Sequence, residues 1–542
     1  MEESHDDKLV SVSQTTPSAE LGPAPIPAVQ LPSLWSPMTL LRVCYRIITL
    51  TLLLTPVVLT FPIWWFFNRG RLETKKGELR TWWVRYLAWS LQRCGGLFIK
   101  LGQWMSSRGD LLPPAVCAVL ARLQNKVKPH SAAHSKAAIS ALYNGASIEE
   151  IFMEFDDAPV GVGAVAQVHR GILRPTNDRP VDTSTTIASP PLEVAIKVLH
   201  PNIHQRISTD LLLVTLFGNF LSMFPAAKYL SIREEVANFT QMMHNQLDLR
   251  LEAHNLQVFA KNFKDVPAVE FPTPIEWNER VLVETFHPGL LLREVLDNGP
   301  TPYDHMIAQA GVTAFMQMIL HDNFFHSDLH PGNILLTFTH TPHPASFAEQ
   351  AGAWFSTKID PSPSTRVATQ ALFQTRTLDP DTLDNLRRAP QDSWTPILSR
   401  LKKNGFVPRL VILDAGMVGV LTDDNLRNMK AAFLAGLEFD GERIAELLLT
   451  RSRHPEGVRD PDGAKRTLGK IMDDLKIDTG GQLPLSRIHS ADIITRVSDL
   501  LRTHHISLDG FASLFVCCVL VEGVGRRLHA DMDLVQPLSE YL

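Results

Sequence analysis

The chain has 542 residues, a formal net charge of -5, and 45% hydrophobic and 20% charged residues, a composition typical of a globular protein that excludes a fibrous or wholly disordered one. That length accommodates two or three domains. The weakly acidic balance lacks the basic face that nucleic-acid binding needs, and we expect no nucleic-acid partner. No cysteines have CxxC or zinc-ligand spacing, so they are interpreted as buried or lipid-facing thiols in a reducing compartment. They are Cys44, Cys94, Cys117, Cys517 and Cys518.

Residues 1–38 are predicted to form a disordered N-terminal tail, because an acidic start is followed by Ser, Thr and Pro without an apolar pattern. The tail does not resemble an arginine-rich, acid-poor mitochondrial presequence. Either the targeting signal is unusual or the natural start of the chain differs.

Residues 47–67 are predicted to form one N-terminal transmembrane helix, the alternative being a buried or interfacial helix. They carry no charged side chain and are long enough to cross the ~30 Å hydrocarbon layer. Basic residues flank both ends, and Trp64 and Trp65 suit an aromatic belt. Pro56 and Pro62 weaken a helix but are tolerated in membranes. The excess of basic residues after the span places the body of the chain on the inner side of the membrane.

Beyond the span, the apolar spacing divides the chain into three predicted parts. They are a helical extension at 77–155, a β-rich N-terminal lobe at 156–290 and a mainly helical C-terminal lobe at 291–542. Within the N-terminal lobe, two strand-like runs, VAQVHRGIL and LEVAIKVLH, are joined by a loop rich in Pro, Thr and Ser. Within the C-terminal lobe, residues 338–408 are rich in the same residue types and are predicted to be a largely disordered surface insertion.

The segment VGVGAVAQVH at 160–169 joins two predicted strands through small residues. Small residues allow the backbone to approach a phosphate, whose oxygens the N–H groups can bind. Ala166 stands where a third glycine would complete a GxGxxG pattern, and an ordinary hairpin turn is the alternative interpretation. The candidate phosphate-binding residues are Gly161, Gly163, Ala164, Ala166 and Gln167.

A lysine at the end of a strand and a glutamate on a helix form the next candidate pair. Lys197 ends the apolar run VAIK and is expected to point inward, where an ammonium needs a carboxylate or a phosphate. Glu252, on the predicted helix QLDLRLEAHN, is its expected partner. The alternatives are a lysine whose stem lies along the surface and an exposed helix glutamate.

Two loops carry carboxylates in an order typical of phosphoryl transfer. The first, HSDLHPGN at 326–333, matches the kinase pattern H-R-D-x-x-x-x-N, with serine in place of arginine. In it, Asp328 is the candidate catalytic base and Asn333 a candidate magnesium ligand. The second is the Asp-Ala-Gly that follows an apolar strand and resembles DFG, so Asp414 is the other candidate magnesium ligand.

Taken in order, these signals predict an α+β, two-lobed protein-kinase-like fold with an N-terminal helical extension and one N-terminal transmembrane helix. The implied cofactors are ATP and Mg2+, because a phosphate clamp, a fixed cation, metal ligands and a carboxylate near the attacking oxygen are the parts that phosphoryl transfer needs. The predicted catalytic residues are Asp328, Lys197 and Glu252.

The chain resembles the UbiB family of atypical kinases, also called aarF-domain-containing or ADCK proteins, from about residue 90 onward. Its KxGQ signature is Lys100, Gly102 and Gln103 in GLFIKLGQWMSSRGDLLP. The runs AVAQVH, FFHSDLHPGN and, near the end, LVEGVGRRLHADMDL are also similar to family motifs. The resemblance implies that the KxGQ helix folds over the active site, where other kinases bind peptide, so that Lys100 and Gln103 face the nucleotide pocket.

The resemblance also implies a setting and a role. The setting is a membrane, here the mitochondrial inner membrane, with a single-pass anchor. The role is support of coenzyme Q (ubiquinone) biosynthesis or related lipid metabolism, by an ATPase or small-molecule kinase activity. A membrane lipid or a quinone precursor is the implied substrate, and a lipid-biosynthesis protein complex the implied partner.

Three departures from the family pattern leave the activity open. Gly161 and Gly163 replace an alanine-rich loop, and the family's ExD motif reads Gln246-Leu-Asp248, without the carboxylate that the family offers to Lys100. No A-P-E motif follows Asp414, which disfavours a conventional protein kinase. Two hypotheses remain: an active ATP-dependent enzyme, and a pseudokinase scaffold that uses ATP as a conformational switch.

Overall fold

The structure of the chain is a computed structural model. The residues that it describes are 37–68, 82–106, 114–120, 122–123, 128–175, 191–223, 232–340, 376–450, 452, 457–479 and short stretches between 496 and 529. Nearly all of the predicted N-terminal tail, the loop at 176–190 and most of the C-terminal motif at 520–534 therefore lie outside the described residues.

An antiparallel sheet forms the N-terminal lobe, in the order β1-β3-β4-β7-β6, with β2 paired to β3. Both strand-like runs form strands, and alternate side chains of β4 are buried, as expected of a sheet with one face on a core. The first strand lies within the segment predicted as helical extension, because Phe152 joins the core of this sheet. The strands are β1 Phe152–Phe155, β2 Gly161–Val162, β3 Ala166–Leu173, β4 Leu192–Leu199, β6 Pro274–Trp277 and β7 Val281–Thr285.

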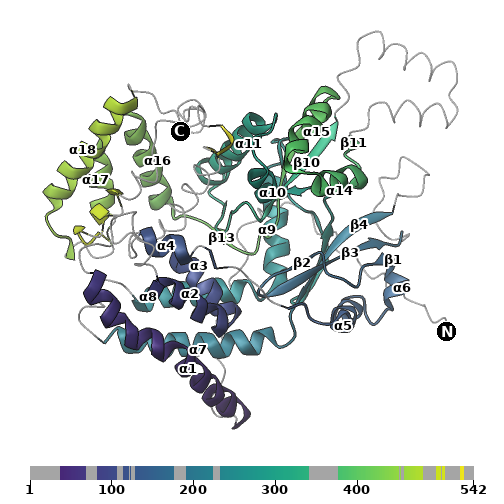
Figure 1. Cartoon of the computed structure of the whole chain (residues 1–542), viewed down its shortest axis with the longest axis horizontal. Helices are drawn as coiled ribbons and strands as arrows, with labels where there is room; N and C mark the ends of the chain where they lie inside the picture. Colours follow the sequence, from purple (N-terminus) through teal and green to yellow (C-terminus); the bar gives the residue numbers. More distant parts are fainter. Residues whose placement is uncertain are drawn as a thin grey trace, which may run out of the picture.

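A second sheet lies in the C-terminal lobe, in the order β11-β10-β12-β5, with β8 paired to β10. A small ladder of β9 and β13 lies beside it and joins the two loops that carry the candidate carboxylates. The strands are β5 Val269–Glu270, β8 Leu290–Leu291, β9 Phe325–His326, β10 Ile334–His340, β11 Arg376–Thr377, β12 Phe406–Ile412 and β13 Val418–Gly419. The helices around them are α10 Leu292–Asp297, α11 Asp304–Met316 and the π-helical turn η3 Gln317–His321. These two lobes confirm the predicted kinase-like architecture (Figure 1).

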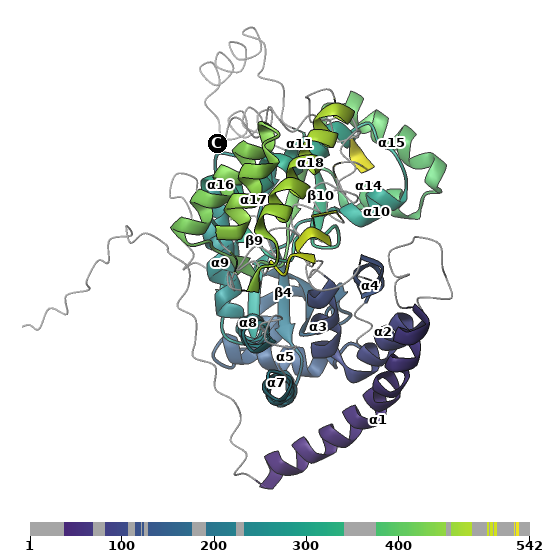
Figure 2. The ribbon, with the colours of Figure 1, turned by 90° about the vertical axis from the view of Figure 1, so that its left-hand side faces the viewer.

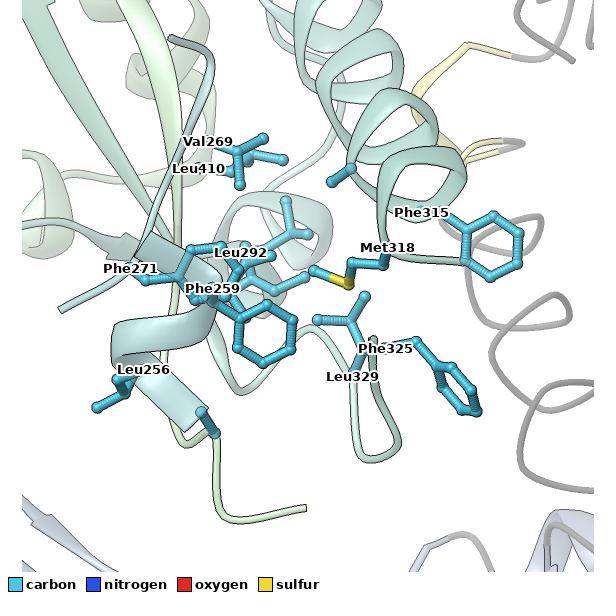
Figure 3. Packing of buried hydrophobic residues seen from close by; sticks show 14 of the residues in the cluster. Leu256, Phe259, Val269, Phe271, Leu292, Phe315, Met318, Phe325, Leu329 and Leu410 are labelled. Atoms are coloured by element: carbon cyan, nitrogen blue, oxygen red, sulfur yellow. The ribbon is translucent and has the colours of Figure 1, made fainter. Parts of the chain in front are cut away.

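Helix α9, Leu249–Asn262, ties the two lobes together through its apolar face. The Phe259 ring stacks on Phe271 with centroids 4.6 Å apart and also contacts Phe324, which precedes β9. Figure 3 shows Phe259 among the same cluster as Leu329, the residue after the candidate base. Because close-packed cores resist displacement, this cluster fixes Glu252 on α9 relative to the catalytic loop.

The predicted disordered insertion is wrong over part of its length. Residues 341–375 lie outside the described residues, but helices follow them: α14 Pro380–Arg388 and α15 Gln391–Lys403. Leu386, Trp394 and Leu398 are buried by these helices, at helical spacing. The Pro and charged residues of the segment lie at helix starts and on exposed faces, which is why its composition resembles that of a disordered segment.

Helices α1 and α7 lie at the opposite end of the molecule from α14 and α15 (Figure 1 and Figure 2). Helix α3 carries the KxGQ residues, and α1 lies against α2 and α7 at the edge (Figure 2). Among the described residues, Leu40–Trp64 is the one helical stretch long and apolar enough to cross a membrane, with a mean hydropathy of 2.0. The helices are α1 Pro37–Asn68, α2 Trp82–Cys94, α3 Gly96–Ser106, α4 Pro114–Leu120, α5 Ala132–Leu142, α6 Ile148–Ile151, α7 Ile203–Leu221 and α8 Ile232–Asn245, and α16 Asp423–Leu437, α17 Gly441–Thr450 and α18 Pro461–Thr479 complete the C-terminal part.

Helix α1 is fastened to the body by Arg46. Its guanidinium donates to both carboxylate oxygens of Asp210 on α7, and it also donates to the Cys94 carbonyl at the end of α2. Most of the apolar side chains after Arg46 stay exposed; they include Ile47, Ile48, Leu52, Val58, Leu59 and Ile63. The lipid-crossing part that we predict therefore follows Arg46 along α1.

Candidate active site

A buried lysine–glutamate pair is the centre of the site. Lys197 on β4 donates to both carboxylate oxygens of Glu252 on α9, at 2.7 Å each. The Glu252 side chain is 5% exposed and that of Lys197 is 16% exposed, so both charges depend on each other rather than on water. Burial opposes the charged form of Lys197, but Asp414 and Glu252 outweigh it and raise the pKa of Lys197. A fixed, permanently charged cation of this kind is suited to phosphate oxygens.

Asp414 brings a second carboxylate to the same lysine. Its Oδ1 atom lies 3.2 Å from the Lys197 ammonium, and its side chain is 41% exposed, so the carboxylate remains open to a ligand. Burial alone would raise its pKa, but Lys197 and Lys100 outweigh burial and hold the pKa of Asp414 well below its usual range. The backbone of Asp414 has φ 55°, a left-handed conformation that non-glycine residues adopt rarely and mostly at functional sites.

The HSDLHPGN loop carries Asp328 and is bonded to the segment that carries Asp414. The backbone N–H of Asp328 donates to His326 Nδ1 at 3.1 Å, and His326 Nε2 donates to the Leu413 carbonyl at 3.3 Å. The Asn333 amide donates to the Asp328 carbonyl at 3.2 Å, and the Leu413 N–H donates to the Asn333 carbonyl at 2.8 Å. The two motif loops are therefore bonded to each other at Leu413, directly before Asp414.

Helix α3 places Lys100 in contact with Asp328, the candidate base. The Lys100 ammonium donates to Asp328 Oδ2 at 3.0 Å, although the two residues are 228 positions apart. Burial disfavours the charged form of Lys100, but Asp328 and Asp414 outweigh it and raise the pKa of Lys100. The KxGQ helix thus reaches the site. Its lysine forms an ion pair with the carboxylate that would take a proton from an attacking group.

Two predicted nucleotide contacts are placed elsewhere by their side-chain bonds. The Gln103 amide donates to the Leu123 carbonyl, just after α4, at 2.9 Å, and carbonyls at helix ends need such donors. The Gln167 side chain is fully buried and bonded to His130, Ser135 and His169. The buried Gln167 side chain is therefore not directed to a nucleotide, and the amide nitrogen of Gln103 is occupied by Leu123.

The glycine-containing turn between β2 and β3 has room above it. A Cβ atom added to Gly161 would meet no atom within 4 Å, and one added to Gly163 would meet only the Ala166 carbonyl, at 3.4 Å. Neither glycine needs its conformational freedom for a positive φ, so open space is the property that they supply. Ala164 packs against Gly96, where α3 begins, so the KxGQ helix borders the turn.

The donor set fits a magnesium ion shared with phosphates. Asp414 offers a carboxylate, and Asn333 keeps its amide oxygen because its amide nitrogen is the group bonded to Asp328. Among the described residues, no group of three or more His, Cys, Asp or Glu side chains is placed to hold a metal ion. Mg2+ characteristically takes one or two protein oxygens together with substrate phosphates and water.

Two further polar residues of the site were not predicted from the sequence. Asn255 is buried on α9 and donates to the Ala415 carbonyl at 2.8 Å, which fixes the Asp-Ala-Gly turn. Its spacing from Glu252, three positions along one helix face, was the available signal. Glu284 on β7 is buried close enough to Lys197 and Asp414 to influence their charges.

The buried carboxyl of Glu284 is expected to make the stability of the folded chain depend on pH. Burial raises its pKa to about 8, with the charges of Glu252 and Asp414 adding to the rise and Lys197 opposing it. An unfolded glutamate has a pKa of about 4.3, so the folded chain binds this proton more tightly. Its contribution to stability is therefore greatest below about pH 4.3 and is lost as the pH rises toward 8.

We expect Glu284→Gln to raise the melting temperature relative to wild type, by an amount that grows between pH 5 and pH 8. Thermal melts of both proteins across that pH range measure the effect. A difference that is constant with pH would contradict the assignment.

Releasing Asp328 from Lys100 is predicted to raise turnover. Lys100→Met removes the ammonium that holds the carboxylate and keeps the length of the side chain, so ATP consumption should increase roughly tenfold, the rate equivalent of ~1.4 kcal/mol. Steady-state phosphate release measures it, with the exposed Lys128→Met as the control. A fall in turnover would instead assign Lys100 to the phosphates.

The lobes, the lysine–glutamate pair and the two bonded motif loops define a protein of the kinase-like class. The family model described as "ABC1 atypical kinase-like domain" matches residues 122–343. An ABC1 family protein of Schizosaccharomyces pombe, named as mitochondrial, is 32% identical over 92% of this chain and 71% of that protein. One of Saccharomyces cerevisiae, also named as mitochondrial, is 31% identical over 91% of this chain and 73% of that protein. A "Probable protein kinase UbiB" of Pectobacterium carotovorum is 26% identical over 89% and 74%.

The chain therefore belongs to the ABC1 family of atypical kinase-like proteins, to which the UbiB proteins are also similar. The resemblance inferred from KxGQ and DxHPGN is confirmed.

Proposed function

We propose that the chain is a membrane-anchored, ATP-dependent phosphoryl-transfer enzyme that acts in quinone or mitochondrial lipid metabolism. The observation that carries the proposal is Lys197, held between Glu252 and Asp414 at 2.7 and 3.2 Å. A lysine bonded to a helix glutamate, beside a carboxylate that remains open, is the arrangement that binds a nucleotide triphosphate and its metal in kinases.

Each charged residue has one task in this mechanism. Bound Mg2+ and ATP supply the phosphoryl group and neutralise its charge. Lys197 would hold the α- and β-phosphates, Asp414 and Asn333 would hold the metal, and N–H groups of the 161–166 turn would bind phosphate oxygens. Asp328 orients the attacking hydroxyl or water and accepts its proton, once Lys100 has moved off its carboxylate.

The proposed setting combines three supports. The relatives from both yeasts are named as mitochondrial. Helix α1 exposes an apolar surface long enough to cross a bilayer. Helix α3 lies over the catalytic loop, which leaves less room for a peptide and favours a small substrate drawn from the membrane, such as a lipid or a quinone precursor.

The test is ATP consumption by the full-length protein in lipid vesicles with Mg2+, compared between wild type and Asp414→Asn. The variant keeps the shape of the side chain but removes the charge that binds the metal, so turnover should fall at least ~100-fold. Equal rates in the two proteins would overturn the proposal.

A nucleotide-gated scaffold is the second candidate, and the Lys100–Asp328 ion pair favours it. With its carboxylate bonded at 3.0 Å, Asp328 is not free to act as a base in this conformation. Mg-ATP binding without any turnover, in vesicles and in Lys100→Met alike, would select the scaffold over the enzyme.

A further inference from the structure

A chain of buried polar side chains lies behind the glycine-containing turn. It starts at Asp156, after β1, and ends at the carbonyl of Gly163 in the turn itself. Its members come from β3, from the start of α5, from the segment just before α5 and from the residue that follows β4. They are His130, Ser135, Gln167, His169 and His200, and Ser135, Gln167 and His169 are fully buried.

The bonds at the turn end of this chain run through two imidazoles. His200 Nε2 lies 3.0 Å from the Gly163 carbonyl oxygen, and His200 Nδ1 lies 2.8 Å from His130 Nδ1. His130 Nε2 lies 2.9 Å from the Ser135 hydroxyl. The backbone of His200 also donates, from its N–H to the Val165 carbonyl at 2.9 Å. His200 therefore holds two carbonyls of the turn.

The partner types fix which nitrogen of His200 carries the proton. A carbonyl only accepts, so His200 carries its proton on Nε2 and accepts on Nδ1 from His130. The Ser135 hydroxyl lies 2.9 Å from both His130 Nε2 and His169 Nε2, and its one proton can be donated to only one of them at a time. At the other end, His169 donates from Nδ1 to the Asp156 carbonyl at 2.8 Å and accepts on Nε2 from the Gln167 amide at 2.9 Å.

The bonds from His130 to His200 and from His200 to the Gly163 carbonyl thus run in one direction, toward the turn. Burial lowers the pKa of His130 to about 4, and the neighbouring His200, His134 and His169 lower it further.

The network lies next to the 161–166 turn and can therefore influence how mobile that turn is. The turn is bordered on one side by Gly96 of α3, which contacts Ala164, and is held on the other by His200. Glycines with open space beside them leave the turn free to move, and a mobile turn binds a triphosphate weakly because ordering it costs free energy.

We propose that His200 is a positioning residue for nucleotide binding, which holds the 161–166 turn in its phosphate-binding shape through the Gly163 carbonyl, with His130 bonded to its other ring nitrogen. The inference rests on the proposed function, because it supplies the phosphate clamp with its rigidity. His200 itself touches no phosphate: its side-chain bonds go to Gly163 and His130.

Hydrogen exchange of the full-length protein without nucleotide tests the network on its own. In His200→Leu, the peptide that contains the 161–166 turn should exchange at least tenfold faster than in wild type, the ratio expected for the loss of about one hydrogen bond. His200→Gln can still donate to the Gly163 carbonyl and should restore most of the protection. Unchanged exchange in His200→Leu would overturn the proposal.

Nucleotide affinity tests the consequence. His200→Leu should bind Mg-ATP about tenfold more weakly but adenosine within twofold of wild type, because the turn contacts phosphates and not the base. A merely structural defect would weaken both ligands equally, which would contradict the positioning role. Should wild type bind no Mg-ATP, the proposed function fails, while the exchange experiment still decides whether His200 orders the turn.

The matched control is His244→Leu. Among the described residues, His244 on α8 has its Nε2 atom buried without a hydrogen-bond partner, so replacing it with leucine removes no bond. Neither exchange at 161–166 nor Mg-ATP affinity should change in this variant. A change as large as that of His200→Leu would trace the effect to general packing and overturn the specific role of His200.

Discussion

Lys197→Met is expected to weaken Mg-ATP binding by at least ~100-fold, equivalent to about 3 kcal/mol of binding free energy, because the phosphates lose their fixed cation. The physical reason is that Lys197 carries the cation that Glu252 and Asp414 hold in place. Without it, two carboxylates face the phosphates and repel them. Isothermal titration of the full-length protein in detergent measures the affinity.

Methionine at position 197 also leaves Glu252 buried without its ion-pair partner, so a loss of folding could imitate a loss of binding. The double variant Lys197→Met/Glu252→Leu removes both charges and should recover thermal stability without recovering affinity. Lys264→Met, at a lysine whose side chain is 71% exposed, should change neither. Wild-type affinity in Lys197→Met would contradict the assignment of Lys197 to the phosphates.

Asp328→Asn is expected to lower ATP turnover by about 10²- to 10⁴-fold, the usual contribution of a general base, while Mg-ATP affinity stays within about twofold. The amide keeps the shape of the side chain but cannot accept the proton of the attacking group. Phosphate release and titration, measured on the same protein preparation, separate the two quantities.

The control for this prediction is Asp265→Asn, at an aspartate whose side chain is 86% exposed and far from the motif loops in the chain. It should leave turnover unchanged. Equal ATP consumption by wild type and Asp328→Asn would remove catalysis by Asp328 from the account and leave the scaffold hypothesis.

The sequence predicted the kinase-like fold because its signals are local and ordered. Each motif is a strand end or a loop whose residue types suit one task, and their order along the chain restricts the folds that can unite them. Lys197, Glu252, Asp328, Asn333 and Asp414 are brought together by the lobes in this way. The contact of Lys100 with Asp328 spans 228 positions, and the resemblance to the family, not the local pattern, anticipated where that helix lies.

What the sequence did not predict depends on packing. Gln167 lies on β3 and His200 directly follows β4, but only the folded chain shows that His130, from a different segment, completes their network. The helices α14 and α15 were missed because each is short and carries many charged residues, and the buried face of α15 becomes evident only against β12. Asn255 was missed because a buried helix asparagine has no sequence signature of its own.

The most direct measurement is a structure of the full-length protein with Mg2+ and a non-hydrolysable ATP analogue. The account predicts a triphosphate between Lys197 and the 161–166 turn, a metal ion bound by Asp414 and Asn333, and Lys100 displaced from Asp328. A nucleotide bound outside this cleft, or a cleft left empty at millimolar analogue with Lys197 still bonded to Asp414, would contradict it.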